Sequence, residues 1–137
     1  MVATAHFTTA ELACRCGCGL ATFHDGFLVA LESLRRAFDE PMSITSACRC
    51  TAHNEQIGGH PNSLHVGDRE QHPGQKGALA VDVATPNGAY RGRLFATAWR
   101  LGWSIGWNAR KGFLHLDRRI AVGLAQNSFD YDSKVKP

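Results

Sequence analysis

An aspartate inside an otherwise apolar segment is the clearest sign of chemistry in this sequence. Asp82 lies within residues 79–84, and every other member of this segment is apolar. Such a segment is typical of a buried strand, where a carboxylate is costly unless it is paired with a cation or bound to a metal. The pattern therefore predicts either a buried ion pair or a metal ligand at residue 82.

Two histidines are candidate partners for this carboxylate. His115 alternates with leucines in a strand-like stretch and shares one face of that stretch with Asp117. His65 lies in a glycine-rich loop before the Asp82 segment, where its simplest interpretation alone is a solvated side chain. Two imidazoles and one carboxylate can form a tetrahedral zinc site that keeps one position for water. Zinc at such a site lowers the pKa of the water and polarises a carbonyl group.

Arg49 is a fourth candidate for the same site. It follows the strand-like stretch that ends at Ser46 and stands between two cysteines. A guanidinium close to a zinc-activated water could hold a substrate carboxylate or the oxyanion of a tetrahedral intermediate. The alternative for Arg49 is an ordinary surface arginine, since most arginines are exposed.

The cysteines do not form a familiar zinc pattern. Zinc ribbons and knuckles usually space their cysteines as Cys-x2-Cys or wider, whereas here the spacing is Cys-x-Cys. An odd number also excludes complete pairing in disulfides within the chain. We expect mostly reduced core residues, with a structural metal or a disulfide between the two groups as the alternative, for the five cysteines Cys14, Cys16, Cys18, Cys48 and Cys50.

Capping residues and apolar repeats predict three helices. Thr8 and Glu11 form a capping-box pattern at the start of the first helix. Asp25 is the expected cap of the second helix, and Asn87 is that of a third over residues 88–101. The second helix repeats apolar residues on one face, at Phe27, Leu31, Leu34 and Phe38.

Strands and loops complete the predicted fold. A short helix is expected over residues 51–57, a loop over 60–76, and strands over 42–46, 78–84, 103–107 and 113–117. This order of elements favours an α+β fold in which helices pack on one face of a small antiparallel sheet that carries the metal site. We expect one domain over residues 1–137, with its core at about 7–122 and a polar C-terminal tail over 123–137.

Composition excludes several classes of protein. The chain has 137 residues, of which 44% are hydrophobic and 20% charged, a globular rather than a disordered composition. The net charge of +3 is mild, and without a basic and aromatic stripe it argues against a nucleic-acid binder. No apolar stretch approaches the roughly 20 residues of a membrane span, so we expect no membrane insertion. The first residues also lack the pattern of a secretory signal.

Five blocks of the sequence follow an order shared with a known family. They are ITSACRC over residues 44–50, HN at 53–54, IGGHPNSLH over 57–65, AVDV over 80–83 and FLHLD over 113–117. Together they resemble the zinc D-alanyl-D-alanine carboxypeptidase family, whose small phage-encoded members carry T-S-G-x-R, N-x-x-V-G-G, S-x-H-x(6)-D and H-x-D in that order. The cysteine-rich opening over residues 7–19 is also similar, so the likeness extends from about residue 7 to residue 119.

The resemblance implies a peptidase of bacterial cell-wall peptide stems with a Hedgehog/DD-peptidase-like α+β fold. It implies that His65, Asp82 and His115 are the zinc ligands and that Arg49 binds the substrate carbonyl or carboxylate. Asp117 is then the nearest candidate for the general base that takes a proton from water. It could equally orient one of the metal ligands.

The sequence departs from the family pattern in three places. Residues 66–76 look like an insertion between the first histidine and the aspartate, and they contain His72, a rival for the first ligand position. Ala47 replaces the glycine that usually precedes the arginine. Glycine and phenylalanine stand at the two places before the last ligand where many relatives carry the base, which is why Asp117 is considered for that role.

These observations together predict zinc-dependent hydrolysis of peptide bonds in peptidoglycan stem peptides. The bond is that of a D-Ala-D-Ala carboxypeptidase or of a stem or cross-bridge endopeptidase. The alternative is a catalytically weak cell-wall-binding module that keeps zinc. We expect a monomer made in the host cytoplasm that reaches the wall as a bacteriophage endolysin released through membrane holes, or as a virion component.

Overall fold

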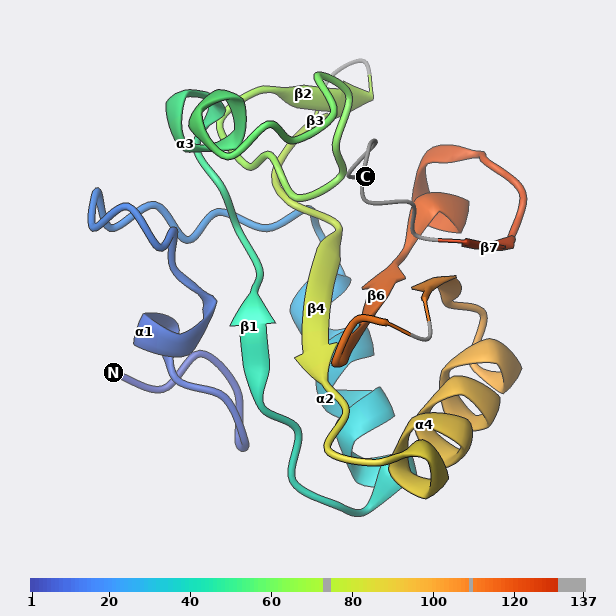
Figure 1. Ribbon diagram of the computed structural model, residues 1–137. Coiled ribbons are helices and arrows are strands. Elements are labelled where there is room, and N and C mark those ends of the chain that lie inside the picture. Colours follow the sequence, from blue (N-terminus) through green and yellow to red (C-terminus); the bar gives the residue numbers. More distant parts are fainter. Residues whose placement is uncertain (73–74, 109, 131–137) are drawn as a thin grey trace.

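A sheet of five strands forms the centre of the fold (Figure 1). The computed structural model describes residues 1–72, 75–108 and 110–130. In spatial order the strands are β1 (Ile44–Ser46), β4 (Ala80–Ala84), β6 (Phe113–Asp117), β5 (Ser104–Trp107) and β7 (Ser128–Asp130). The combination of this sheet with separate helices confirms the predicted α+β class.

Strand β7 makes the sheet mixed, whereas a purely antiparallel sheet was expected. The other four strands pair antiparallel with their neighbours, but β7 pairs in parallel with β5. This strand lies in the segment that was expected to be a polar tail. Its Phe129 ring packs 5.9 Å from the ring of His115 and 4.9 Å from the guanidinium of Arg119. The packing of this one aromatic side chain stabilises the pairing of an otherwise largely polar segment with the sheet.

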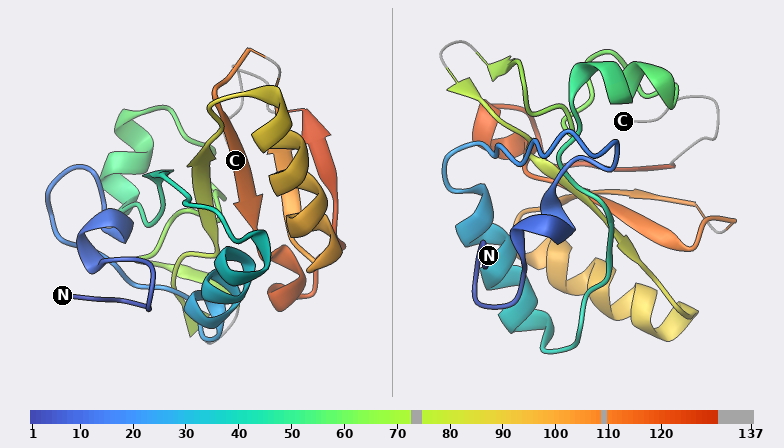
Figure 2. Two further views of the ribbon diagram at one scale, coloured as in Figure 1. Left: turned by 90° about the horizontal axis from the view of Figure 1, so that it is seen from below. Right: turned by 90° about the vertical axis from the view of Figure 1, so that its left-hand side faces the viewer.

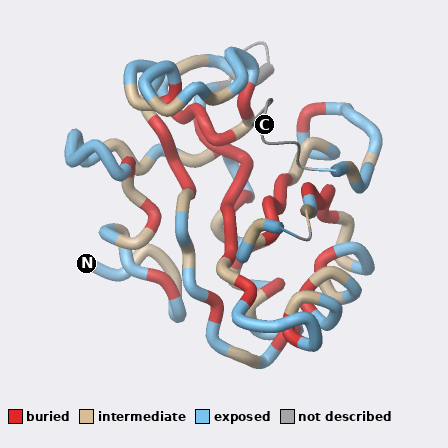
Figure 3. The backbone as a smooth tube through the Cα atoms, in the orientation of Figure 1, coloured by how far each residue is buried: buried red, intermediate tan, exposed pale blue. Residues whose placement is uncertain are grey.

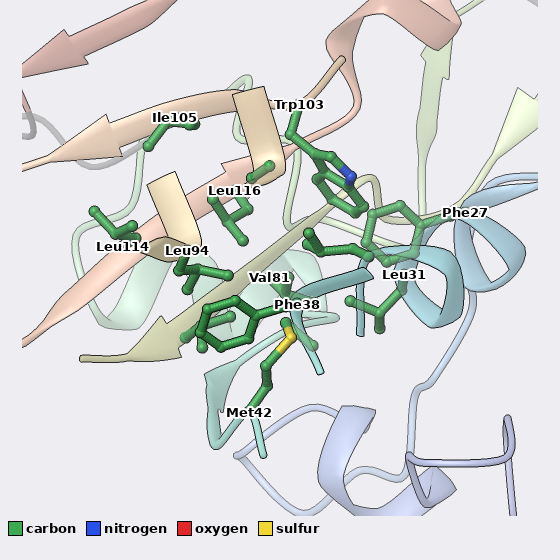
Figure 4. Packing of buried hydrophobic residues seen from close by; sticks show 14 of the residues in the cluster. Phe27, Leu31, Phe38, Met42, Val81, Leu94, Trp103, Ile105, Leu114 and Leu116 are labelled. Carbon is green, nitrogen blue, oxygen red and sulfur yellow. The ribbon is translucent and has the colours of Figure 1, made fainter. Parts of the chain in front are cut away.

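Two amphipathic helices cover one face of the sheet. These are α2 (Phe27–Phe38) and α4 (Gly88–Arg100), which lie on the same side of the strands in Figure 2. The predicted apolar face of α2 is buried and belongs to one hydrophobic cluster with Leu94 of α4 and with Val81 and Leu116 of the sheet (Figure 4). Each such side chain contributes roughly 1.5–3 kcal/mol of burial free energy, so this layer fixes the position of β4 and β6.

The helix caps agree with two of the three predictions. Thr8 forms the capping box with Glu11 at the start of α1 (Thr9–Leu12), and the Asn87 side chain accepts a hydrogen bond from the Tyr90 amide at the start of α4. The prediction for α2 was wrong, because its N-cap is Gly26 and not Asp25. Gly26 has a φ of 82°, a left-handed conformation that favours glycine.

Smaller elements lie beyond the ends of β1 and β4, at the top of Figure 1. They are the helix α3 (Thr51–Gln56) and the hairpin of β2 (Glu70–His72) and β3 (Gln75–Lys76), which occupies part of the segment expected to be a loop. A 3-10 turn, η1 (Arg119–Val122), follows β6. Within the described residues, no helix has the length and apolar character needed to cross a bilayer.

Candidate metal centre

The sheet places two of the candidate ligands side by side. Asp82 of β4 and His115 of β6 are direct cross-strand partners. Because side chains alternate along a strand, both point away from the face that Val81 and Leu116 present to the core. Strand β4 is buried from Ala80 to Val83 and half-buried at Ala84, and Figure 3 shows that the residues just before it are buried too. The apolar character of this strand, noted in the sequence, therefore reflects burial on both faces.

His65 is brought to the same point by hydrogen bonds of its own loop. The hydroxyl of Ser63 accepts a hydrogen bond from the His65 backbone amide at 3.2 Å. The His65 carbonyl accepts from the Arg49 amide at 2.7 Å, and the carbonyl of Leu64 accepts from the Leu79 amide at 2.7 Å. The Ser-x-His motif is thus a local turn that is attached to residue 49 on one side and to the start of the β4 segment on the other.

The three side chains meet at one point. His65 Nε2 lies 3.1 Å from Asp82 Oδ1 and 3.2 Å from His115 Nδ1, and His115 Nδ1 lies 3.1 Å from the same carboxylate oxygen. Bonds of about 2.0–2.1 Å to a tetrahedral ion would place its ligand atoms roughly 3.3 Å apart. The triangle therefore has the size and the donor types of three ligands around one divalent ion.

The outer nitrogens decide where the imidazole protons lie. His65 Nδ1 is 2.6 Å from the carbonyl oxygen of Ala47, which can only accept. His115 Nε2 is 2.8 Å from Oδ2 of Asp117, an ionised carboxylate that also only accepts. Both outer nitrogens therefore donate, and in the neutral rings both inner nitrogens carry lone pairs. Two nitrogen lone pairs and Oδ1 of Asp82 then face one another and need a cation between them.

Burial and neighbouring charges shift the pKa values of all three clustered side chains. Burial raises the pKa of Asp82, but the neighbouring charge of His65 and hydrogen bonds from both imidazoles hold it well below its usual range. Burial lowers the pKa of His65. Burial also lowers the pKa of His115, but its hydrogen bonds to Asp117 and Asp82 outweigh this and raise the pKa to about 9. A metal at the inner nitrogen of His115 would have to compete with a proton there, so metal binding would be weaker at low pH.

Arg49 lies beside this cluster and is held by several groups. Its Nη2 is 3.7 Å from Oδ2 of Asp82, while Nη1 donates to Asn54 Oδ1 and Nε donates to Ser46 Oγ, both at 3.2 Å. Arg49 and Asp82 are each 4% exposed. The guanidinium is therefore a fixed positive charge next to a candidate ligand, not the exposed surface arginine that was the alternative.

Gly59, which follows α3, supports Arg49 through Asn54. The amide of Gly59 donates to the Asn54 carbonyl at 2.8 Å, and the Asn54 side chain donates to the carbonyl of His60 at 3.0 Å. A Cβ on Gly59 would overlap the Asn54 side chain. Asn54 and both glycines were part of the family resemblance, but sequence reasoning gave them no role toward Arg49. The contacts of Asn54 and Gly59 show that these two residues position the arginine.

Asp117 lies on the outer side of the His115 ring. It is fully buried, and its Oδ2 contacts the outer nitrogen of His115, on the side of the ring away from Asp82. Arg119 donates to its Oδ1 at 2.9 Å and to its Oδ2 at 2.8 Å. Burial raises the pKa of Asp117, but these hydrogen bonds lower it to about 2. These contacts favour the orienting role that the sequence also allowed for Asp117, and sequence reasoning missed Arg119 as its partner.

His72, the alternative to His65 as the first metal ligand, has its backbone in β2. The side chain of His72 lies outside the part of the chain that the structure describes. Among the residues that the structure describes, His65 is the histidine that groups with Asp82 and His115 as a potential metal ligand.

A model of the Peptidase M15 family matches residues 5–117, a span that contains Arg49 and all three clustered side chains. The chain belongs to this family. Searches of curated proteins and of solved structures returned no match. Membership confirms the resemblance to zinc D-Ala-D-Ala carboxypeptidases and implies a metallopeptidase, because M15 peptidases depend on a metal.

Proposed function

We propose that this M15 peptidase uses zinc to hydrolyse peptide bonds in the stem peptides of bacterial peptidoglycan. His65, Asp82 and His115 are the proposed zinc ligands. The observation that carries this proposal is the triangle of three acceptor atoms, in which each imidazole is oriented by a hydrogen bond to its outer nitrogen. Three protein ligands leave a fourth tetrahedral position for water, as in other catalytic zinc sites.

Each residue around the cluster then has a definite task. When bound, zinc would lower the pKa of a water molecule and polarise the scissile carbonyl. Arg49 binds the developing oxyanion or the terminal carboxylate of the substrate through its Nη2 side, which faces the cluster. Asp117 keeps the proton of His115 on the outer nitrogen, so that the inner nitrogen remains a ligand. Burial keeps bulk solvent away and strengthens each of these electrostatic interactions.

The substrate class is proposed from the family resemblance and from Arg49. A buried guanidinium beside the metal suits a peptide that ends in a carboxylate, as D-Ala-D-Ala stems do. Cleavage within the stem or the cross-bridge would use the same arginine on the scissile carbonyl. The likeness to phage-encoded members supports action at the cell wall as a phage lysin or as a virion component.

Mass spectrometry of purified peptidoglycan digests tests this function. We expect the zinc-loaded protein to release D-alanine or to create new amino ends, and a chelator to abolish the release. His115→Ala should abolish both the activity and the zinc bound at this site. Binding of the protein to intact peptidoglycan without any new end group, at full zinc occupancy, would contradict the peptidase proposal and favour the wall-binding module.

A further inference from the structure

Four of the five cysteines gather at a second place in the molecule. Their sulfur atoms all lie within 4.8 Å of one another, and the group consists of Cys14, Cys16, Cys18 and Cys50. The Sγ atoms of Cys14 and Cys16 are 3.4 Å apart, and each is 3.8 Å from that of Cys50. Only Cys14 and Cys48 are buried, so the expectation of core cysteines holds for these two alone.

The local backbone is shaped to bring these sulfurs together. The segment that follows α1 turns back on itself, with the Cys14 amide donating to the Leu20 carbonyl at 2.8 Å. Gly17 and Gly19 flank Cys18 and have φ values of 89° and 83°, a left-handed conformation that lets the chain reverse direction here. Cys50 comes from a different part of the chain, at the N-cap of α3.

The separations match a metal tetrahedron better than a disulfide. Zinc–sulfur bonds of about 2.3 Å place the sulfurs of a tetrahedral site roughly 3.8 Å apart. A disulfide joins two sulfurs at about 2.05 Å, whereas even the shortest of these separations, between Cys14 and Cys16, is 3.4 Å. Four thiol sulfurs at such distances are the ligand set of a closed structural zinc site.

Backbone amides are directed at the sulfurs, as expected for thiolates. The amide of Cys50 donates to Sγ of Cys14 at 3.4 Å, and the amide of His53 donates to Sγ of Cys50 at 3.3 Å. These hydrogen bonds stabilise negative charge on sulfur and fix the direction of its lone pairs. Cys48 behaves differently, because its sulfur is directed at the carbonyl of Thr22, 3.5 Å away.

We propose that Cys14, Cys16, Cys18 and Cys50 bind a second zinc ion as a structural site. On binding, the four thiols release their protons to solvent, and zinc takes their sulfurs as its four ligands without a change of redox state. This site leaves no position for water and therefore has no catalytic role. It is distinct from the histidine and aspartate cluster and does not depend on the peptidase proposal.

The second site would fasten the amino-terminal segment to the residue that follows Arg49. Arg49 and Cys50 are adjacent, and Arg49 is also joined to the His65 loop through its backbone. Helix α3 has only 6 residues, too few to be stable alone, so it needs such an anchor at its start. Loss of the thiolate site is therefore expected to loosen Arg49 as well as α3.

Zinc stoichiometry in a set of variants tests the proposal. We expect wild-type protein prepared under reducing conditions to bind two zinc ions, and Cys50→Ser or Cys18→Ser to bind one fewer than wild type. Cys48→Ser is the matched control and should equal wild type. His115→Ala should lose the other ion while keeping the thiolate site, so failure of the peptidase proposal and failure of this one give different patterns.

Two further measurements do not depend on the folding of a cysteine variant. Wild-type protein loaded with cobalt(II) should show the sulfur-to-metal charge-transfer absorption of tetrahedral thiolate coordination, and His115→Ala should keep it. The exposed thiols of Cys16 and Cys18 should resist alkylation until a chelator removes the metal. Cobalt spectra without this absorption, or alkylation that is equally fast with and without chelator, would overturn the proposal, as would disulfides among these cysteines in protein prepared with reductant.

Discussion

Replacing Asp117 with asparagine separates an orienting role from a general-base role. The Asp117 carboxylate accepts a hydrogen bond from the outer nitrogen of His115 at 2.8 Å and is held by Arg119. A hydrogen bond of this charge-assisted kind contributes about 1.5–3 kcal/mol. An asparagine amide can donate to the outer nitrogen instead, which favours the tautomer with its proton on the inner nitrogen. The inner nitrogen would then be lost as a metal ligand.

We expect Asp117→Asn to weaken zinc binding by about 10–100-fold, the usual effect of removing such a partner. This corresponds to about 1.4–2.8 kcal/mol and agrees with the contribution of the hydrogen bond. Competition with a chromophoric chelator measures the affinity, and kcat is then measured at saturating zinc, where most activity should return. Asp130→Asn is a matched control, because it removes the same charge from an exposed carboxylate that contacts Asn108.

The opposite pattern would refute this reasoning. A general base contributes about 10²–10⁴-fold to the rate and does not hold the metal. If Asp117→Asn binds zinc as tightly as wild type and its kcat stays low at every zinc concentration, Asp117 takes the proton itself. The inferred direction of the His115 ring would then be wrong.

Three further predictions concern Arg49, Gly59 and Glu32. Arg49→Lys should lower kcat/KM on a D-Ala-D-Ala peptide by about 100-fold at unchanged zinc stoichiometry, because an ammonium cannot reproduce the fixed planar guanidinium. Gly59→Ala should produce a similar loss, since the added Cβ overlaps Asn54 and displaces the arginine it holds; equal kcat/KM for this variant and wild type would contradict the positioning role. Burial raises the pKa of Glu32, but hydrogen bonds from His6 and other groups lower it from 4.5 to about 2, so its stabilisation is present above pH 4.5 and is lost as the pH falls toward 2. Urea unfolding across this pH range should show a weaker acid dependence for Glu32→Gln than for wild type.

The core elements could be predicted because their signal is local. The apolar repeat of α2 and the cap of α4 depend on residues within a few positions of one another, and both are present in the structure. The interpretation of Asp82 also required only its own strand, since a carboxylate among apolar neighbours indicates a partner or a metal. His115 is likewise a polar residue between apolar neighbours in a strand. The sheet register makes Asp82 and His115 direct cross-strand neighbours.

Other features depend on contacts between distant segments and leave little trace in the sequence. The carbonyl that orients His65 belongs to Ala47, and a backbone group carries no residue signature. The cysteine cluster was underestimated because spacing rules consider near neighbours, whereas Cys50 joins sulfurs from a segment 36 residues earlier. The pairing of β7 depends on the packing of Phe129 against groups that only the folded sheet brings together.

The buried charges of the candidate site suggest why it would select an anionic substrate. Asp82 lies between Arg49 and the two imidazoles, and Asp117 lies between Arg119 and His115. With neutral imidazoles, the two arginines and the two carboxylates balance, so a bound divalent cation adds an excess positive charge. In a site shielded from water such a charge acts strongly on nearby groups. We infer that metal binding itself prepares this site for a terminal carboxylate or a developing oxyanion, and that Arg49 fixes where that negative charge lies.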